Sequence, residues 1–458
     1  MSTTQTPQPL HTTFLDQPPS CLEFCPEASD YLVIGTYLLS ESSSEKSTGP
    51  QQSKTGTILL FELDPESFQL TQIHKTSLPH AVFDLHFSPR DPTLFAIATS
   101  AACVSLYRLE ATHEHGPCSS LSSPTSITHL TSIPVHEDPS IPALYFSWLP
   151  PPLLTARSKR SLNHDQYHGQ LSTDGFAVSF SDGRVSIFHT NPPSHDISKE
   201  SMTEIALPGE PVEVWFTTFH YGSSLSGEEQ LMLFSGDDFG GLRVHQFDGD
   251  RGGEGKRQGD GKHGGEQDGM LWDDGQFPTQ SMETSVGGRH HGAGITAILP
   301  LFTEGGETVL LTGSYDEYLR VYKFTGRGSV LAEERLGGGV WRLKVITELK
   351  EEPFAAQGLP NMSRARSYLV LASCMHAGVR IVKVTYSATE GDGLPVGKWD
   401  ITVLAQFMEH ESMNYASDVR RGSEMGGGDN QTEESNYSLL CVSSSFYDKR
   451  VCVWKAKV

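Results

Sequence analysis

A histidine occupies a turn position where other copies of a repeated segment carry an aspartate. The segment CMHAGVRIV (374–382) aligns with SYDEYLRVY (314–322), so that His376 takes the place of Asp316. A carboxylate in such a turn accepts backbone N–H bonds, which an imidazole cannot copy. An imidazole can instead act as a general base or acid near neutral pH. We therefore predict that His376 is a catalytic base that activates a water molecule; the alternative is a structural turn residue.

Two more side chains and a glycine run are expected near this turn. His410 precedes the last repeat on the same face as the turns, and we predict that His410 or Glu317 orients the water. The alternative for His410 is a solvated loop histidine. The backbone N–H groups of Gly338 and Gly339 are candidates for stabilising an oxyanion, although a glycine run can also simply permit a sharp corner.

Familiar hydrolase signatures are absent from the sequence, which holds no GxSxG nucleophile elbow and no HExxH motif. A covalent route through Ser314, Cys374 or Ser445 stays open, because each residue lies near the same turns. Small residues at strand ends more often pack against neighbouring elements, and Cys374 has no flanking cation that would favour its thiolate. We predict neither a metal nor a cofactor, because no ligand spacing for a metal is found; the alternative is a metal bound by His376, His410 and a carboxylate.

Aromatic side chains accompany these turns. The candidates for substrate binding are Tyr315, Trp341, Phe446 and Tyr447. They either pack at the rim or form a cage for a cation, in which each good ring contributes about 0.5 to 2 kcal/mol. Arg342 has the opposite charge and would hold a carboxylate or phosphate, or form an ion pair at a strand edge. The carboxylates of Glu317, Asp237 and Asp238 would attract a cation over a longer range.

Short strands must position these residues, because no long run has apolar residues at helical spacing. An apolar run that ends in small residues and a turn, followed by an alternating segment that closes on a bulky residue, recurs seven times. The clearest copies are 310–324 and 439–454, and they resemble WD repeats, in which an aspartate caps the turn. We predict an all-β fold, a seven-bladed β-propeller that forms one domain over residues 1–458.

The last repeat has no fourth strand after Trp454. We predict that the N-terminal segment 11–16 supplies this strand and closes the ring. Seven repeats of ~40 to 45 residues need only ~300 residues, so the remaining residues must lie in low-complexity insertions, for which disorder is expected. The predicted insertions are residues 40–54, 112–126, 155–173, 248–275, 350–366, 387–397 and 422–434.

The composition limits the classes of partner. The 458 residues include 34 Lys and Arg against 56 Asp and Glu, which gives a formal net charge of −22. Direct nucleic-acid binding is not expected, because it needs clustered cations. We expect no membrane association, since no apolar stretch approaches the ~20 residues that cross a bilayer. The 7 scattered cysteines suit free thiols in a reducing compartment, so we expect the protein to be cytoplasmic. We also expect it to be a monomer.

The motifs of the last third resemble a more specific family. LLTGSYDEYLRVY (310–322), LGGGVWRLK (336–344), ASCMHAGVRI (372–381), HES with NYASDV (410–419) and SSFYDKRVCVW (444–454) occur in the order seen in diphthine methyl esterases, also called diphthine methyltransferases. Two short segments depart from the pattern of that family. Val345 and Ile346 stand where a Trp-His-Pro run is typical, and Asp418 and Val419 follow Ser417 where members often show Asp-Trp.

This resemblance implies hydrolysis of the methyl ester of methylated diphthine on translation elongation factor 2, a step of diphthamide biosynthesis. It also implies a trimethylammonium group on the substrate, which would suit the aromatic candidates. The alternative is a non-catalytic WD-repeat scaffold for protein–protein interaction, because this fold hosts scaffolds more often than enzymes.

Overall fold

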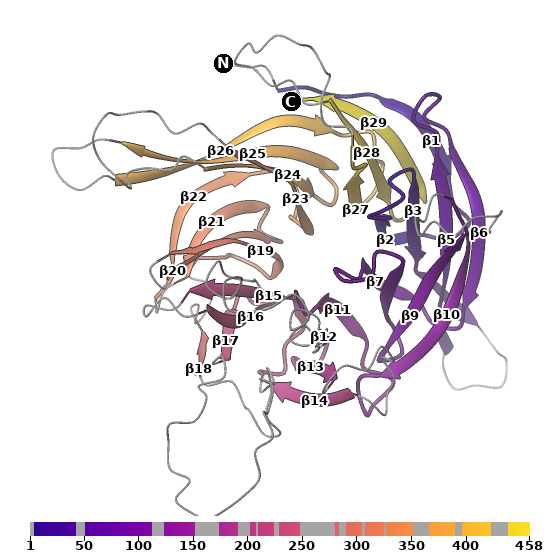
Figure 1. Cartoon of the computed structure of the whole chain (residues 1–458), viewed down its shortest axis with the longest axis horizontal. Helices are drawn as coiled ribbons and strands as arrows, with labels where there is room; N and C mark the ends of the chain where they lie inside the picture. Colours follow the sequence, from indigo (N-terminus) through magenta and orange to yellow (C-terminus); the bar gives the residue numbers. More distant parts are fainter. Residues whose placement is uncertain are drawn as a thin grey trace, which may run out of the picture.

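The computed structural model is all-β and forms seven antiparallel sheets arranged as a propeller (Figure 1). This confirms the predicted fold class. The structure describes residues 4–42, 51–111, 123–151, 174–190, 202–207, 209–223, 229–247, 280–283, 290–304, 307–324, 327–350, 366–389, 396–422 and 438–458. Among these residues no helix is long and apolar enough to cross a membrane.

Each blade places one strand against the axis of the ring. These innermost strands are β2 (Pro19–Phe24), β7 (Val82–Phe87), β11 (Ala143–Trp148), β15 (Val214–Ser223), β19 (Ile295–Glu304), β23 (Arg342–Lys350) and β27 (Asn414–Val419). Neighbouring innermost strands contact one another around the circle, and β27 contacts β2 to complete it.

The outer strands of each blade follow along the chain. They are β3 (Tyr31–Thr36), β5 (Gln51–Leu63) and β6 (Leu70–Leu78) in blade 1; β8 (Leu94–Thr99), β9 (Cys103–Ala111) and β10 (Pro124–Pro134) in blade 2; β12 (Gly175–Phe180), β13 (Val185–Thr190) and β14 (Met202–Leu207) in blade 3; β16 (Glu229–Asp237), β17 (Leu242–Phe247) and β18 (Gln280–Glu283) in blade 4; β20 (Glu307–Ser314), β21 (Tyr318–Phe324) and β22 (Ser329–Arg335) in blade 5; β24 (Arg366–Ser373), β25 (Val379–Thr389) and β26 (Val396–Phe407) in blade 6; and β28 (Ser438–Ser445) and β29 (Arg450–Lys457) in blade 7.

Burial along a blade explains the sequence pattern. The second strands β3, β8 and β12 are buried at every residue, because adjacent blades cover both of their faces. The outermost strand β22 instead alternates between partly buried and exposed residues. The apolar core therefore lies between blades, and one such cluster joins blade 7 to blade 1 through Val442, Val453 and Leu32.

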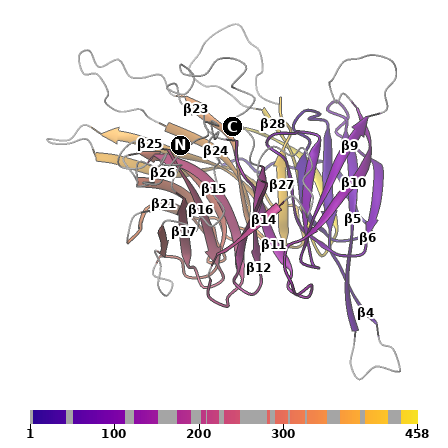
Figure 2. The same ribbon diagram turned by 60° about the horizontal axis from the view of Figure 1, so that its bottom comes forward.

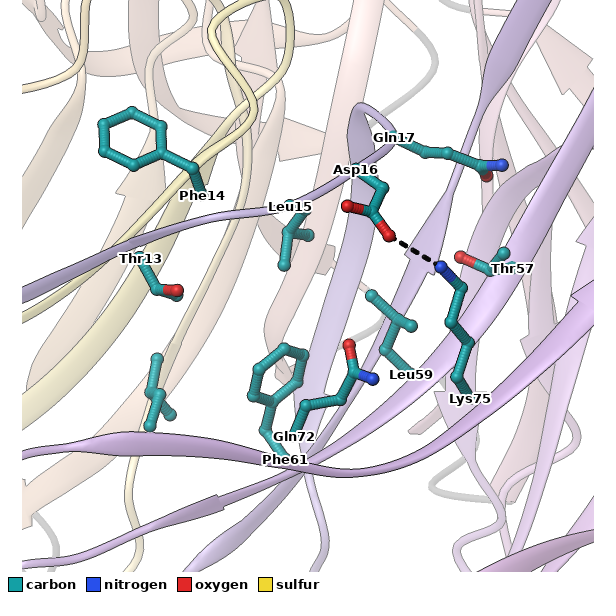
Figure 3. Close-up of a pocket in the computed structure, with 11 residues that line it drawn as sticks. Thr13, Phe14, Leu15, Asp16, Gln17, Thr57, Leu59, Phe61, Gln72 and Lys75 are labelled. Carbon is teal, nitrogen blue, oxygen red and sulfur yellow. Dashed lines mark hydrogen bonds and ion pairs between the residues drawn. The ribbon is translucent and has the colours of Figure 1, made fainter.

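The chain closes its ring with a strand from the N-terminus. β1 (Pro9–Phe14) pairs antiparallel with β29, so that Thr12 lies opposite Cys452 at the outer edge of blade 7. Just beyond β1, a cavity of about 160 Å³ separates this segment from β5 and β6 (Figure 3). The ion pair of Asp16 with Lys75 (2.8 Å) spans it, but both groups are open to solvent, so this bridge contributes little.

Several predicted insertions overlap strands, including residues 124–126 of the insertion 112–126, which begin β10. Within the segment 40–54, β4 (Leu38–Ser42) pairs with the start of β5, and this hairpin extends from the body of the propeller (Figure 2). Within the segment 387–397, the end of β25 pairs with the start of β26. Continued ladder hydrogen bonds satisfy these polar backbones, which composition alone does not reveal. The insertions at 155–173 and 248–275 lie outside the described residues, as do residues 112–122, 351–365 and 423–434 of three others.

Candidate active site

Consecutive turns of blades 5, 6 and 7 are joined on one face of the ring by backbone hydrogen bonds. The N–H of Val340 donates to the carbonyl of Ser314 (2.9 Å), and the N–H of Trp341 to that of Ser373 (2.8 Å). The N–H of Asn414 donates to Met375 (3.0 Å). These bonds place the motifs of the last third next to one another, and we call this belt of turns the rim.

His376 lies at the tip of the blade 6 turn. The turn is held by its own backbone, because the N–H of Ala377 donates to Cys374 (2.8 Å) and the N–H of Gly378 to Met375 (3.1 Å). The His376 side chain is exposed, and no described residue forms a hydrogen bond or an ion pair with it. His376 therefore does not cap the turn, and its imidazole faces solvent.

The aspartates of the equivalent turns do cap. Asp316 accepts hydrogen bonds from the N–H groups of Gly292 (2.7 Å) and Tyr318 (3.1 Å) and pairs with Arg320. In blade 7, Asp448 accepts a hydrogen bond from the hydroxyl of Ser412 (2.6 Å). Both aspartates cap their turns, as expected for Asp316. In the turn of His376 the side-chain contact comes instead from Arg380, whose Nη1 donates to the carbonyl of Ala377 (2.6 Å).

His410 is not a rim residue, and its prediction as a partner of His376 is wrong. Its ring is only 8% exposed. Nε2 forms a hydrogen bond with the hydroxyl of Ser443 (2.8 Å), which also accepts the indole N–H of Trp454 (3.0 Å). Burial lowers the pKa of His410 to about 4, so the buried ring is neutral. His410 is a packing residue, and the alternative of a solvated loop histidine is wrong as well.

Glu317 does not serve His376 either. Its carboxylate accepts hydrogen bonds from the guanidinium of Arg335 at 2.8 and 2.9 Å, at the end of the outermost strand β22. This ion pair directs the carboxylate toward the outside of the blade. The prediction that Glu317 orients a water is therefore wrong, because the charge is already paired.

Three aromatic rings meet on the rim between blades 4, 5 and 6. The ring centroids of Tyr315 and Trp341 are 6.0 Å apart. Trp215 lies 6.0 Å from Tyr315 and 5.7 Å from Trp341. All three side chains are partly exposed, so they form a corner that is open on one side. We call these three rings the aromatic corner.

Further rings continue the corner toward blade 1. Tyr415 lies 5.1 Å from Trp341 and 5.5 Å from Phe446, and Phe446 contacts Tyr447 at 5.1 Å. Tyr447 is 68% exposed, while Phe446 is partly buried against Tyr37. The predicted binding residues thus form a continuous band, with Tyr447 at its free end.

Arg342 lies directly below this band. Its guanidinium carbon is 4.6 Å from the ring centroid of Trp341 and 4.7 Å from that of Tyr145. Nη1 donates to the carbonyl groups of Thr296 (3.2 Å) and Trp341 (3.0 Å), and Nη2 lies 4.0 Å from the carboxylate of Asp84. Stacking and these two bonds hold the group at the mouth of the central cavity.

The glycine run packs against the turn that carries His376. A Cβ on Gly338 would collide with the carbonyl oxygen of Cys374, and a Cβ on Gly339 would lie 2.8 Å from the sulfur of Met375. Glycine is therefore required here for close packing. In the described part of the chain, the N–H groups of Gly338 and Gly339 have no hydrogen-bond partner.

The three nucleophile candidates are all buried. Ser314 donates its hydroxyl to the carbonyl of Ala293 (3.0 Å), and Ser445 is fully covered. Burial raises the pKa of the Cys374 thiol to about 12, so it is not a thiolate near neutral pH. None of the three is accessible for attack on a protein-bound ester.

Charged residues that were not identified from the sequence line the cavity below Arg342. Its volume is about 190 Å³. His86 lies 3.0 Å from Asp84 and 3.5 Å from Glu23, and Lys344 lies 2.8 Å from Asp418. These carboxylates outweigh the cost of burial and raise the pKa of His86 to about 10. His86 is therefore held mainly as the imidazolium near neutral pH, paired with Asp84 and Glu23.

Trp215 and Tyr415 were also missed, although a signal existed. The ladder between the innermost strand and its neighbour shifts register between Val214 and Phe216, and again between Asn414 and Ala416. Each β-bulge leaves the intervening aromatic residue without a register partner and turns it toward the rim. An aromatic residue at this position in several repeats could have pointed to the band. In the described residues no group of three or more metal-ligating side chains occurs.

No family model matches the chain. Individual relatives do. The diphthine methyltransferase of Schizosaccharomyces pombe is 24% identical over 98% of this chain and 97% of that protein. The resemblance to diphthine methyltransferases is confirmed. The protein of that name from Saccharomyces cerevisiae is 22% identical over 95% of both chains.

A shorter match covers only part of the chain. The human diphthine methyltransferase is 29% identical over 34% of this chain and 28% of the human protein. Among solved structures, Sqt1 from Saccharomyces cerevisiae covers 99% of this chain at 10% identity with a TM-score of 0.46.

Proposed function

We propose that this protein acts in diphthamide biosynthesis as a carboxylic ester hydrolase. Its substrate would be the methyl ester of methylated diphthine on elongation factor 2, in the cytoplasm. The near full-length similarity to two diphthine methyltransferases supports the pathway. The exposed His376, whose neighbour Met375 lies with Tyr315 against Gly339, carries the hydrolytic part of the proposal.

The proposed mechanism uses water as the nucleophile. Nε2 or Nδ1 of His376 accepts a proton from a water as its oxygen bonds to the ester carbonyl carbon. The carbonyl oxygen becomes an oxyanion, and we assign its stabilisation to the N–H groups of Gly338 and Gly339, which have no hydrogen-bond partner among the described residues and belong to the run that packs against the turn of His376. Collapse of this intermediate breaks the bond to the methoxy group. The imidazolium returns its proton to that group, so the products are methanol and the carboxylic acid.

The test is a single-turnover incubation of the full chain with elongation factor 2 that carries methylated diphthine. Mass spectrometry of the modified peptide should show the loss of one methylene mass, and the methanol released should equal the ester consumed. The matched control is the same reaction with the His376→Ala variant. No mass loss with a folded wild-type protein would reject the hydrolase.

A non-catalytic scaffold is the second candidate. The observation that favours it is the burial of Ser314, Cys374 and Ser445, which leaves no accessible nucleophilic side chain among them. A scaffold would bind the modified elongation factor without changing its mass. A pull-down with ester and free acid forms, run beside the mass measurement, separates the two candidates.

A further inference from the structure

An acidic group stands at the aromatic corner. The indole N–H of Trp215 donates to the carboxylate of Asp238 (2.7 Å). Burial and the negative charge of Asp238 both raise the pKa of the Tyr315 phenol, and Arg342 acts on the same phenol in the opposite direction. Asp238 and Tyr315 approach one another across Gly294, where a Cβ would lie 2.9 Å from Cα of Asp238 and 3.0 Å from Cδ2 of Tyr315. On the blade 6 side of the corner, the guanidinium carbon of Arg342 lies 4.6 Å from the ring centroid of Trp341.

Asp238 differs from the other carboxylates of the neighbouring turns. Asp237 pairs with Arg243 (3.2 Å), and Glu317 pairs with Arg335. No lysine or arginine of the described residues forms an ion pair with Asp238, and its backbone N–H is used only to donate to the carbonyl of Glu213 (2.9 Å). Its negative charge is thus available to a ligand that lies against the rings.

Arg342 provides a positive group within the same small region. Its Nη1 is committed to two backbone carbonyls, but Nη2 has only the distant carboxylate of Asp84 at 4.0 Å. The face toward the cavity therefore keeps donor capacity for a carboxylate, which a guanidinium binds well. The side chain is 17% exposed, so the partner would be partly shielded from water.

We propose that the corner and Arg342 form one site with two poles, which binds a small zwitterion. The methylated ammonium group lies against Trp215, Tyr315 and Trp341 beside Asp238, and the carboxylate lies on Arg342. This inference rests on the proposed function, because that substrate carries the ammonium group and yields a carboxylate. It adds that the site binds the free acid product more tightly than the methyl ester, since the ester group has no negative charge to pair with Arg342.

Binding of three small probes to the full-length protein tests this inference. Glycine betaine carries both charges, its methyl ester keeps only the ammonium group, and tetramethylammonium has no carbonyl. Titration calorimetry, supported by the fluorescence of the corner tryptophans, should rank betaine first. We expect betaine to bind about 5- to 30-fold more tightly than its methyl ester, as a charge-assisted pair would give.

Two variants separate the poles. Asp238→Asn keeps a hydrogen-bond acceptor for Trp215 but removes the negative charge. It should lower the affinity for each of the three probes by about 3- to 10-fold. Arg342→Gln should remove the preference for betaine over its ester without weakening the binding of tetramethylammonium, because a guanidinium 4.6 Å from the Trp341 ring repels a cation. Glu137→Gln is the control, because this exposed carboxylate pairs with Arg184 on blade 3. Thermal unfolding of each variant checks that it is folded.

The outcomes are distinct. Equal affinity of the wild type and Asp238→Asn for tetramethylammonium, or no binding of any probe, would overturn the cationic pole. Equal affinity for betaine and its ester in the wild type would overturn the role of Arg342. These titrations involve neither elongation factor 2 nor hydrolysis, so a failed esterase assay with the expected probe ranking would reject the proposed function alone.

Discussion

Two histidines of the last third have opposite environments, although both occur in loops on one face of the ring. His410 is 8% exposed and joins Ser443 and Trp454 in a buried hydrogen-bonded chain. His376 is exposed at the tip of a turn that its own backbone closes. The ring of Phe407 packs on Trp454 at 4.8 Å and on His410 at 5.3 Å, which covers His410 further.

The contrast shows that a histidine in a repeat protein must be judged by its position within the repeat. A histidine that precedes the innermost strand can reach back under the blade to the second and third strands, as His410 does. A histidine at the tip of the turn between those strands stays exposed, as His376 does. The first position favours a neutral structural ring, and the second leaves an imidazole free for proton transfer.

Replacing His376 should have the largest effect of any single change on the proposed reaction. We expect His376→Ala to lower the single-turnover rate of ester hydrolysis by about 10²- to 10⁴-fold, because a general base is lost. Its thermal unfolding should stay near that of the wild type, since the side chain makes no contact that holds the turn. Rapid-quench mass spectrometry measures the rate.

Cys374→Ala is the matched comparison in the same turn. Its thiol is buried and its pKa is raised to about 12, so the rate per folded molecule should be unchanged. A near-normal rate for His376→Ala together with a lost rate for Cys374→Ala would reverse the assignment and restore the covalent route.

Replacing His410 should act on stability instead. We expect His410→Ala to lower the free energy of unfolding by about 3 to 5 kcal/mol, because it leaves a cavity and removes a partner of the buried Ser443 hydroxyl. Urea denaturation followed by tryptophan fluorescence measures this change. The hydrolysis rate per folded molecule should stay constant at a temperature well below unfolding. A stable but inactive His410→Ala protein would return His410 to the active site.

The stability should fall in mild acid, and His410 should account for part of the fall. Its pKa is about 4 in the folded chain against the usual 6.5, so between these values the unfolded chain binds the extra proton. The stabilising contribution is therefore complete above pH 6.5 and is lost as the pH falls toward 4, to a total of roughly 3 kcal/mol.

Urea midpoints between pH 7 and 4.5 measure this dependence. The curve of His410→Gln should be flatter than that of the wild type, because glutamine does not titrate. Other buried histidines, including His291, act in both proteins, so the difference between the curves isolates His410. Parallel curves would show that the buried ring does not stay neutral.

The smallest effect should come from the free end of the aromatic band. We expect Tyr447→Ala to weaken substrate binding by only about 2- to 5-fold, because the ring is 68% exposed and lies beyond the corner. The rate at saturating substrate should not change. Trp341→Phe, in the corner itself, is the reference. If Tyr447→Ala weakens binding more than Trp341→Phe, the binding surface is centred on blade 7.

The repeat pattern predicted the seven blades. Each strand shows as a short apolar or alternating run, and each turn between strands shows as small residues or an aspartate. It also identified His376, since one turn lacks the aspartate that its neighbours use as a cap. These features depend on residues that are close in sequence. They could therefore be predicted without knowing how the blades pack.

Only the tertiary structure decided the fate of His410, Glu317 and the three nucleophile candidates. Each depends on a partner from another strand, such as Ser443 for His410 or Arg335 for Glu317. The same holds for Trp215 and Asp238, which come from blade 4 and meet rings of blades 5 and 6 at the rim. Burial and charge pairing depend on neighbours that are distant in sequence, and only the packing of the blades brings those neighbours together.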